Sequence, residues 1–162
     1  ALERVEYLRG LPDAAMESLA RHARTQHYAA GEIGVRQGEH SDELYVCMSG
    51  DLNVSYAAGN EPPEIVGHIH PGEAFGEMAL MTGAPRAATV TTETSSELLM
   101  IDRDAFREVV DEHPEVAEKI EECLRRRRQA IDTIESAHAE AHEHDPVHKP
   151  DLMGRVRDFF SI

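Results

Sequence analysis

Apolar residues near the N-terminus recur at the spacing of an amphipathic helix. Two sets are separated by Pro12 and Asp13; the first is Leu2, Val5, Leu8 and Leu11, and the second is Met16, Leu19, Ala20 and Ala23. Positions three or four apart share one face of a helix. The pattern therefore predicts that residues 1–24 form two short helices.

From residue 25 to residue 101 the pattern changes to short apolar runs separated by glycine-bearing turns. These glycines are Gly31, Gly38, Gly50, Gly59 and Gly72. Residues 51–56 alternate between apolar and polar side chains, and residues 57–63 have the Gly, Asn and Pro content of a loop. Many short strands at this spacing are typical of a β-sandwich or a jelly-roll barrel.

Helical spacing returns in residues 102–140. Asp102 is placed to cap a helix that carries Phe106, Val109 and Val110, and Pro114 starts another helix. The second helix has an apolar stripe of Val116, Ile120, Leu124, Ile131 and Ile134. Arg127 lies on this stripe, either because its stem covers apolar surface while its head reaches water, or because it contacts a ligand.

The last part of the chain, residues 141–162, is predicted to be a His-rich linker and a short amphipathic tail helix. His138 and His142 are four residues apart and could share a metal ion, but a solvated helical tail is favoured. The tail carries Leu152, Val156, Phe159 and Phe160 on one side. Such a stripe is expected to pack on this domain, on a sister subunit or on a membrane surface.

Length and charge limit the classes of function. The chain has 162 residues, enough for one domain with short appendages. Its 31 acidic and 16 basic residues give a net charge of −15, which repels nucleic acid, so no nucleic-acid partner is expected. An anionic ligand would then need a local basic site, since distant charges are screened beyond about 8 Å.

Other features of the composition point to a reduced, soluble domain. Cys47 and Cys123 are too few for a disulfide framework, and we expect both to be reduced and buried. No secretory signal or apolar stretch of about 20 residues is present. Because the chain begins at Ala1 inside an apolar helical pattern, we expect a module to precede it.

The segment from Pro71 to Val90 has the parts needed to hold a phosphorylated sugar. Gly76 permits a sharp turn, and the helical turn that begins at Glu77 has free N–H groups that attract an anion. Arg86, after the rigid Pro85, offers a planar fork for phosphate oxygens. Glu77 would repel an anion unless it accepts hydrogen bonds from hydroxyl groups. Glu77 and Arg86 together therefore indicate a ligand with a sugar beside a phosphate.

This segment resembles the phosphate-binding cassette of the cyclic-nucleotide-binding domain family, and the resemblance extends over residues 2–134. It implies an α+β fold: an eight-stranded β jelly-roll barrel with a short N-terminal helical segment, a cassette helix inside the barrel, and C-terminal B and C helices. Within the family, the sequence is most similar to the C-terminal domains of prokaryotic cyclic-nucleotide-gated ion channels, including mechanosensitive-type channels.

The resemblance also implies ligand contacts. Gly76 and Glu77 would contact the ribose, Arg86 the cyclic phosphate, and Arg127 the base as part of a lid. The other expected contacts are Val54, Gly67, Met78, Ala79 and Ala87. Family members that favour cGMP commonly carry Thr after the phosphate-binding Arg, where this chain has Ala87. The expected ligand is therefore cAMP, with cGMP as a weaker second ligand.

The resemblance favours a regulatory domain that catalyses no reaction, because the cassette has no nucleophile beside a base. The expected host is a bacterial channel whose membrane module precedes this domain, which would lie at the cytoplasmic face of the membrane, in a homo-oligomer. A free-standing cAMP sensor, a transporter and a kinase are the alternatives. A transcription factor is disfavoured, since only about 25 residues follow the long helix, and a kinase regulatory subunit would normally carry two cassettes.

A metal enzyme is a remote alternative. His68, His70 and Glu73 are similar to the His-x-His…Glu ligands of cupins, but the spacing after Glu73 differs and no later His element follows. No metal ligand is therefore assigned.

Overall fold

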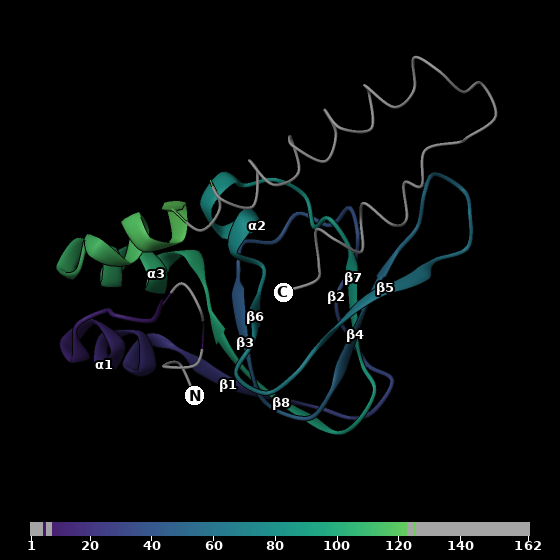
Figure 1. Cartoon of the computed structure of the whole chain (residues 1–162), viewed down its shortest axis with the longest axis horizontal. Coiled ribbons are helices and arrows are strands. Elements are labelled where there is room, and N and C mark those ends of the chain that lie inside the picture. The colour runs from purple at the N-terminus through teal and green to yellow at the C-terminus, as the bar shows by residue number, and fades with distance from the viewer. Residues whose placement is uncertain (1–4, 6–7, 123–124, 126–162) are drawn as a thin grey trace, which may run out of the picture.

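The structure, a computed structural model, describes residues 5, 8–122 and 125 (Figure 1). Its helices are α1 (Asp13–His22), α2 (Glu77–Thr82) and α3 (Arg103–Glu112), and residues 115–122 are also helical. Its strands are β1 (Arg24–Tyr28), β2 (Ile33–Val35), β3 (Leu44–Ser49), β4 (Leu52–Tyr56), β5 (Glu64–Ile69), β6 (Ala74–Phe75), β7 (Thr89–Thr92) and β8 (Ser96–Ile101).

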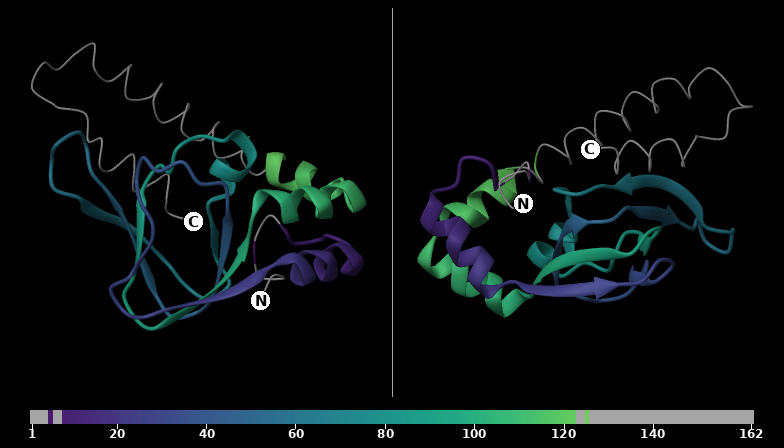
Figure 2. Two further views of the ribbon diagram at one scale, coloured as in Figure 1. Left: turned by 180° about the vertical axis from the view of Figure 1, so that it is seen from behind. Right: turned by 90° about the horizontal axis from the view of Figure 1, so that it is seen from below.

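The eight strands form two antiparallel sheets that face each other (Figures 1 and 2). One sheet has the order β1-β8-β3-β6 and the other β2-β7-β4-β5. The predicted eight-stranded antiparallel architecture is confirmed, but no closed barrel is found, since no ladder joins the two sheets among the described residues. The edge strand β6 has only two residues before the chain turns at Gly76, so this edge of its sheet is short.

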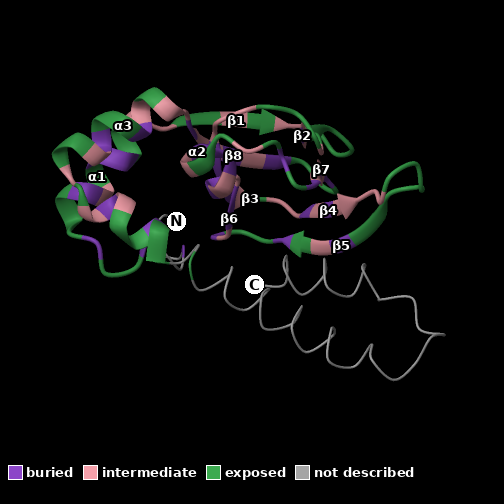
Figure 3. Cartoon of the chain, turned by 90° about the horizontal axis from the view of Figure 1, so that it is seen from above, coloured by how far each residue is buried: buried purple, intermediate pink, exposed green. Residues whose placement is uncertain are grey.

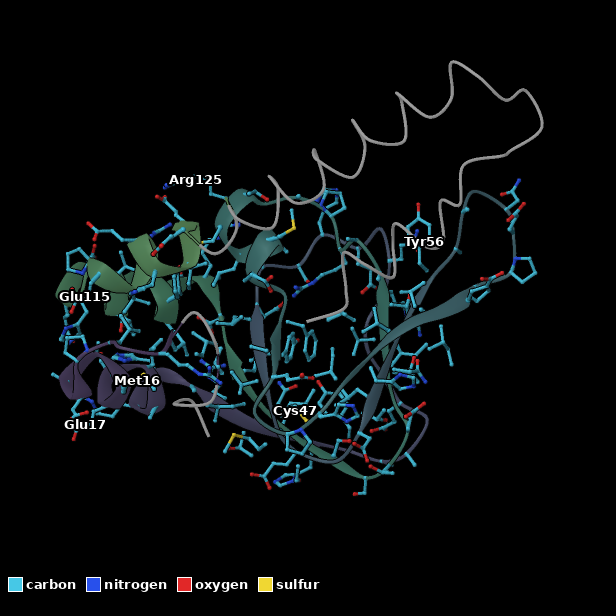
Figure 4. All side chains as sticks on the ribbon, in the orientation of Figure 1. Met16, Glu17, Cys47, Tyr56, Glu115 and Arg125 are labelled. Atoms are coloured by element: carbon cyan, nitrogen blue, oxygen red, sulfur yellow. The ribbon has the colours of Figure 1, made fainter. Side chains whose placement is uncertain are left out.

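Residues 44–47 of strand β3 are buried on both faces, which explains the apolar run from Leu44 to Met48. Tyr45 and Cys47 point between the sheets and pack with residues of the opposite sheet such as Val54 and Val90. Leu44 and Val46 point the other way, into a cluster shared with the helices. The alternation of side chains along a strand thus joins the two parts of the core. Cys47 is labelled in Figure 4 and is a free thiol, as expected.

Helices α1 and α3 pack side by side and cover the sheet that contains β3 (Figures 1 and 3). Their buried faces carry Leu19 from α1 and Phe106 and Val109 from α3. The hydroxyl of Ser18 donates to Glu112 Oε2 at 3.1 Å, so one polar contact accompanies the apolar packing. Helix α3 and strand β3 thus contribute side chains to one apolar cluster.

The predicted start and end of α3 are confirmed. Asp102 accepts a hydrogen bond from the Ala105 N–H at 2.8 Å, which satisfies one of the open donors of the first turn. The helix ends at Glu112, with His113 as its C-cap before Pro114, and a second helical stretch follows. Most of the first predicted N-terminal helix, and the chain after residue 122 except Arg125, lie outside the described residues.

Two further findings bear on the expectations from sequence. The five predicted glycine turns, at Gly31, Gly38, Gly50, Gly59 and Gly72, all have positive φ. Within the described part of the chain, none of the helices combines the length and the apolar character needed to cross a membrane.

Candidate ligand-binding site

A cavity opens where β6, α2 and the loop before β7 face the sheet that contains β2, β4 and β7. Most of its lining comes from residues 73–79 and 84–88, so the predicted cassette forms one wall. Val35, Val54 and Val90 of the other sheet contribute apolar side chains. A small number of polar groups in a mostly apolar cavity is typical of a site for a small organic ligand.

Gly76 fixes the geometry of this wall. Its φ of 91° is in the left-handed region, and α2 begins at the next residue. A Cβ at this position would collide with Nη1 of Arg86 and would lie 2.6 Å from the carbonyl oxygen of Glu43. Both the backbone conformation and the lack of space therefore require glycine here.

Arg86 is almost completely buried, with 5% of its surface exposed, and its guanidinium group is held by four hydrogen bonds. Nε donates to Ser41 Oγ at 2.7 Å, and Nη1 donates to the carbonyl of Gly76 at 3.3 Å. Nη2 donates to the carbonyl of Glu43 at 2.8 Å and to its Oε2 at 3.1 Å. The cation is thus fixed in a dry site, where its interactions with an anion are weakly screened.

An aromatic pair supports the guanidinium group. The Arg86 Cζ atom lies 5.8 Å from the ring centre of Tyr45, within the range of a cation–π contact. Tyr45 is stacked on Phe75, with ring centres 5.1 Å apart and planes at 11°. Burial and the Glu43 carboxylate raise the pKa of Tyr45 to about 12.

Glu77, the first residue of α2, is also buried, with 5% of its surface exposed. It lines the same cavity as Arg86. The site therefore combines a cation that suits phosphate with a carboxylate that can accept hydrogen bonds from hydroxyl groups.

The structure brings most of the predicted contacts together. Gly76, Glu77, Met78, Ala79, Arg86, Ala87 and Val54 all line the cavity. Gly67 pairs with Val54 in the β4–β5 ladder but is not part of the lining. Arg127 lies outside the described residues.

Sequence reasoning missed the groups that hold Arg86. Ser41 and Glu43 are more than 40 residues away from Arg86 in the chain, and they reach it because β3 pairs with β6. The signal in the sequence was the run of polar residues from Glu39 to Glu43, directly before the apolar residues Leu44 to Met48. Polar side chains beside a buried strand are available to pair with a buried charge.

His68, at the end of β5, and His70, just after it, are not arranged with Glu73 as the metal site considered as an alternative. His70 Nδ1 lies 2.9 Å from Asp51 Oδ1, and this hydrogen bond raises the pKa of His70. Glu73 accepts a hydrogen bond from the His70 main-chain N–H at 2.7 Å. Among the described residues, no group of three or more His, Cys, Asp or Glu side chains is arranged to hold a metal ion.

Comparison with known proteins gives a consistent result. A family model described as the cyclic nucleotide-binding domain matches residues 25–113. A CRP-like cAMP-activated global transcriptional regulator of Mycobacterium tuberculosis is 27% identical over 126 residues, 78% of this chain and 56% of the relative. The cAMP-dependent protein kinase regulatory subunit of Dictyostelium discoideum is 34% identical over 108 residues, 65% of this chain and 33% of the relative.

Among solved structures, the catabolite activator protein of Thermus thermophilus has a TM-score of 0.76 and 23% identity. The match covers 82% of this chain and 62% of that protein, and it shows the fold. The chain spans little more than half of the transcriptional regulator and a third of the kinase subunit. Neither of these two relatives is an ion channel, so the expected likeness to channel domains is not confirmed.

Proposed function

Because the chain belongs to the cyclic nucleotide-binding domain family, we propose that it is a regulatory domain that senses cAMP. The observation that carries this proposal is the placement of buried Arg86 and buried Glu77 in one cavity. The bacterial regulator and the kinase subunit are named as cAMP-activated and cAMP-dependent, and these names support the choice of nucleotide.

In this proposal Arg86 binds the cyclic phosphate. The Tyr45 ring and the carbonyls of Gly76 and Glu43 hold the guanidinium group before the ligand arrives. Binding therefore costs little conformational entropy at Arg86. Charge-assisted hydrogen bonds to phosphate are the strongest single interactions available in the cavity. Glu77 accepts a hydrogen bond from the ribose 2′-hydroxyl, and Gly76 lets the sugar approach the main chain.

The base contacts the apolar part of the cavity and sets the preference between nucleotides. Val54, Met78, Ala79 and Ala87 offer no side-chain partner for the amino group of guanine, so the proposal favours cAMP over cGMP. Gly67, beside Val54 in the sheet, stays in the proposal as a backbone position near the base. Arg127 completes the site as a lid on the base.

The cyclic nucleotide is bound and not converted, and its effect is a shift in population between two arrangements of the C-terminal helices. A ligand that prefers the closed arrangement draws the helix that carries Arg127 over the cavity. The packing of α3 on β3 gives this movement a route to the strand that precedes the site.

The proposal also concerns the larger protein that this domain would regulate. The host proposed from the cassette is a membrane channel, with this chain as its cytoplasmic domain in a homo-oligomer. A free-standing sensor, a transporter and a kinase are the alternatives; the relatives support the kinase and add a transcriptional regulator. The complete coding sequence of the gene separates these hosts.

The proposal is tested by titrating the purified chain with cAMP in a calorimeter. Saturable binding at one site per chain is expected. Heats that do not differ from those of buffer would overturn the proposed function.

A further inference from the structure

We propose that the Glu43 carboxylate is an internal competitor for the ligand phosphate. It occupies the Arg86 fork while the site is empty and has to leave when a phosphate binds. The inference rests on the proposed function, since it concerns how the same cavity takes its ligand. It assigns to Glu43 the role of a positioning residue that sets affinity through Arg86.

Most of the N–H donors of Arg86 are already engaged within the protein. A guanidinium group has five N–H donors. Four of them meet acceptors in the structure: Ser41 Oγ, the carbonyl of Gly76, the carbonyl of Glu43 and Glu43 Oε2. Among the hydrogen bonds described, this leaves one donor for a ligand, whereas phosphate recognition by arginine is frequently bidentate.

Of the four acceptors on Arg86, the Glu43 carboxylate is the one that a phosphate would displace. The carbonyls of Gly76 and Glu43 belong to the main chain, and Ser41 lies beside Nε at 2.7 Å. The Glu43 carboxylate is the one charged acceptor of the four, and its side chain is 27% exposed, so it can turn toward water. Its release leaves one donor of Nη1 and one donor of Nη2 for the phosphate.

Charge repulsion between Glu43 and the phosphate also favours the release of the carboxylate. A phosphate and the Glu43 carboxylate on one guanidinium group would be like charges a few ångströms apart. The Arg86 side chain is only 4% exposed, so water screens this repulsion poorly. The nearest other carboxylate in the sequence, Asp42, lies 2.8 Å from Arg103 Nε, so Arg103 balances its charge. Binding therefore requires that Glu43 moves away or remains at a cost in affinity.

Replacing Glu43 by Gln leaves the buried Arg86 cation without its charged partner, which destabilises the free protein. In the complex the ligand phosphate supplies the missing charge, so the complex is destabilised much less. Glu43→Gln should therefore raise the affinity for cAMP by about tenfold, which corresponds to about 1.4 kcal/mol.

The experiment compares the parent chain with Glu43→Gln and Glu39→Gln. Glu39 is a matched control, since it belongs to the same loop and loses the same charge, but its carboxylate lies 3.8 Å from the exposed Arg36 and not on Arg86. The affinity for cAMP and for adenosine is measured by calorimetry. The melting temperature is measured with and without saturating cAMP.

The expected result is tighter cAMP binding by Glu43→Gln, no gain for adenosine, which has no phosphate, and no gain for Glu39→Gln. The melting temperature of free Glu43→Gln should fall, while that of its cAMP complex stays close to the parent. Glu43→Asp, which shortens the carboxylate by one methylene, should show a smaller gain and serves if the Gln variant does not fold.

Three results would overturn the inference. Equal or weaker cAMP binding by the folded Glu43 variants, in a parent that binds cAMP, would overturn it alone and leave the proposed function standing. An equal loss of melting temperature with and without ligand would show that Glu43 has only a structural role. A parent that binds no cAMP would overturn the proposed function and this inference with it.

Discussion

Nη1 of Arg86 lies 3.3 Å from the carbonyl oxygen of Gly76, so the residue that turns the chain into α2 also accepts a hydrogen bond from the buried cation. The turn and the guanidinium group therefore support each other. A change at either residue is expected to disturb both.

The first prediction concerns Gly76→Ala. The residue would have to keep a φ of 91°, and its Cβ would collide with Arg86 and with the carbonyl of Glu43. We expect the free energy of unfolding to fall by about 2 kcal/mol or more, from left-handed strain and overpacking together, and cAMP binding to weaken. Urea unfolding and calorimetry measure both effects.

Gly59→Ala is the matched control for that change. Gly59 also has a positive φ, 60°, but no atom lies within 4 Å of its added Cβ. In Gly59→Ala the free energy of unfolding should therefore fall only by the cost of backbone strain, and the affinity for cAMP should not change. Equal losses in the two variants would show that the contact between Gly76 and Arg86 has no importance for the site.

The second prediction concerns Glu77. If its carboxylate accepts a hydrogen bond from the ribose 2′-hydroxyl, the parent should bind cAMP more tightly than 2′-deoxy-cAMP. Glu77→Ala should reduce this difference by about 1 kcal/mol, the usual value of one hydrogen bond. Calorimetry with both nucleotides measures it, and a variant that discriminates as well as the parent would exclude Glu77 from the ribose contact.

A third prediction concerns nucleotide choice. Ala87 lines the cavity and has no hydroxyl group for the guanine amino group. Ala87→Thr adds one, so cGMP affinity should rise relative to cAMP by about 1 kcal/mol. Competition binding decides between the outcomes: a parent that prefers cGMP, or a mutant with an unchanged ratio, would show that residue 87 does not set the preference.

A fourth prediction follows from the pKa of Tyr45, which burial and Glu43 raise to about 12. An unfolded tyrosine loses its proton at a pKa of about 10. Between these values the unfolded chain binds fewer protons than the folded chain, so the free energy of unfolding should fall as the pH rises from about 10 to about 12. Tyr45→Phe should make this fall smaller.

Unfolding in urea at about pH 9 and about pH 11, on either side of the pKa of an unfolded tyrosine, measures the effect. Tyr56→Phe, at the end of β4 and labelled in Figure 4, is the control. If the two variants show the same dependence on pH, the Tyr45 hydroxyl is not buried in the way that the structure describes.

The parts of the site that could be predicted from sequence are those set by neighbours in the chain. Gly76, Glu77 and Arg86 lie within one short segment, and the turn, the first helical residue and the rigid loop each have a local signature. The cap of α3 by Asp102 was predictable for the same reason.

The contacts that could not be predicted join distant segments. Glu43 meets Arg86 only because β3 lies beside β6, and the pairing of β1 with β8 joins residues that are far apart in the chain, such as Arg24 and Met100. The division of the strands into two sheets and the length of β6, only two residues, are not specified by the sequence pattern. Such features follow from tertiary packing and not from local periodicity.

The central claim is that Arg86 binds the phosphate of a cyclic nucleotide, and cAMP binding by two Arg86 variants tests it most directly. Arg86→Ala removes the charge and the fork, and Arg86→Lys keeps the charge only. Arg36→Ala, at an exposed arginine whose Nε lies 3.8 Å from Glu39 Oε1, is the control. Circular dichroism establishes that each variant is folded before its affinity is measured.

Each charge-assisted contact to phosphate contributes about 1.5–3 kcal/mol. The account therefore predicts that cAMP affinity falls by about tenfold or more in Arg86→Ala, falls less in Arg86→Lys, and is unchanged in Arg36→Ala. A folded Arg86→Ala protein that binds cAMP as tightly as the parent would contradict it.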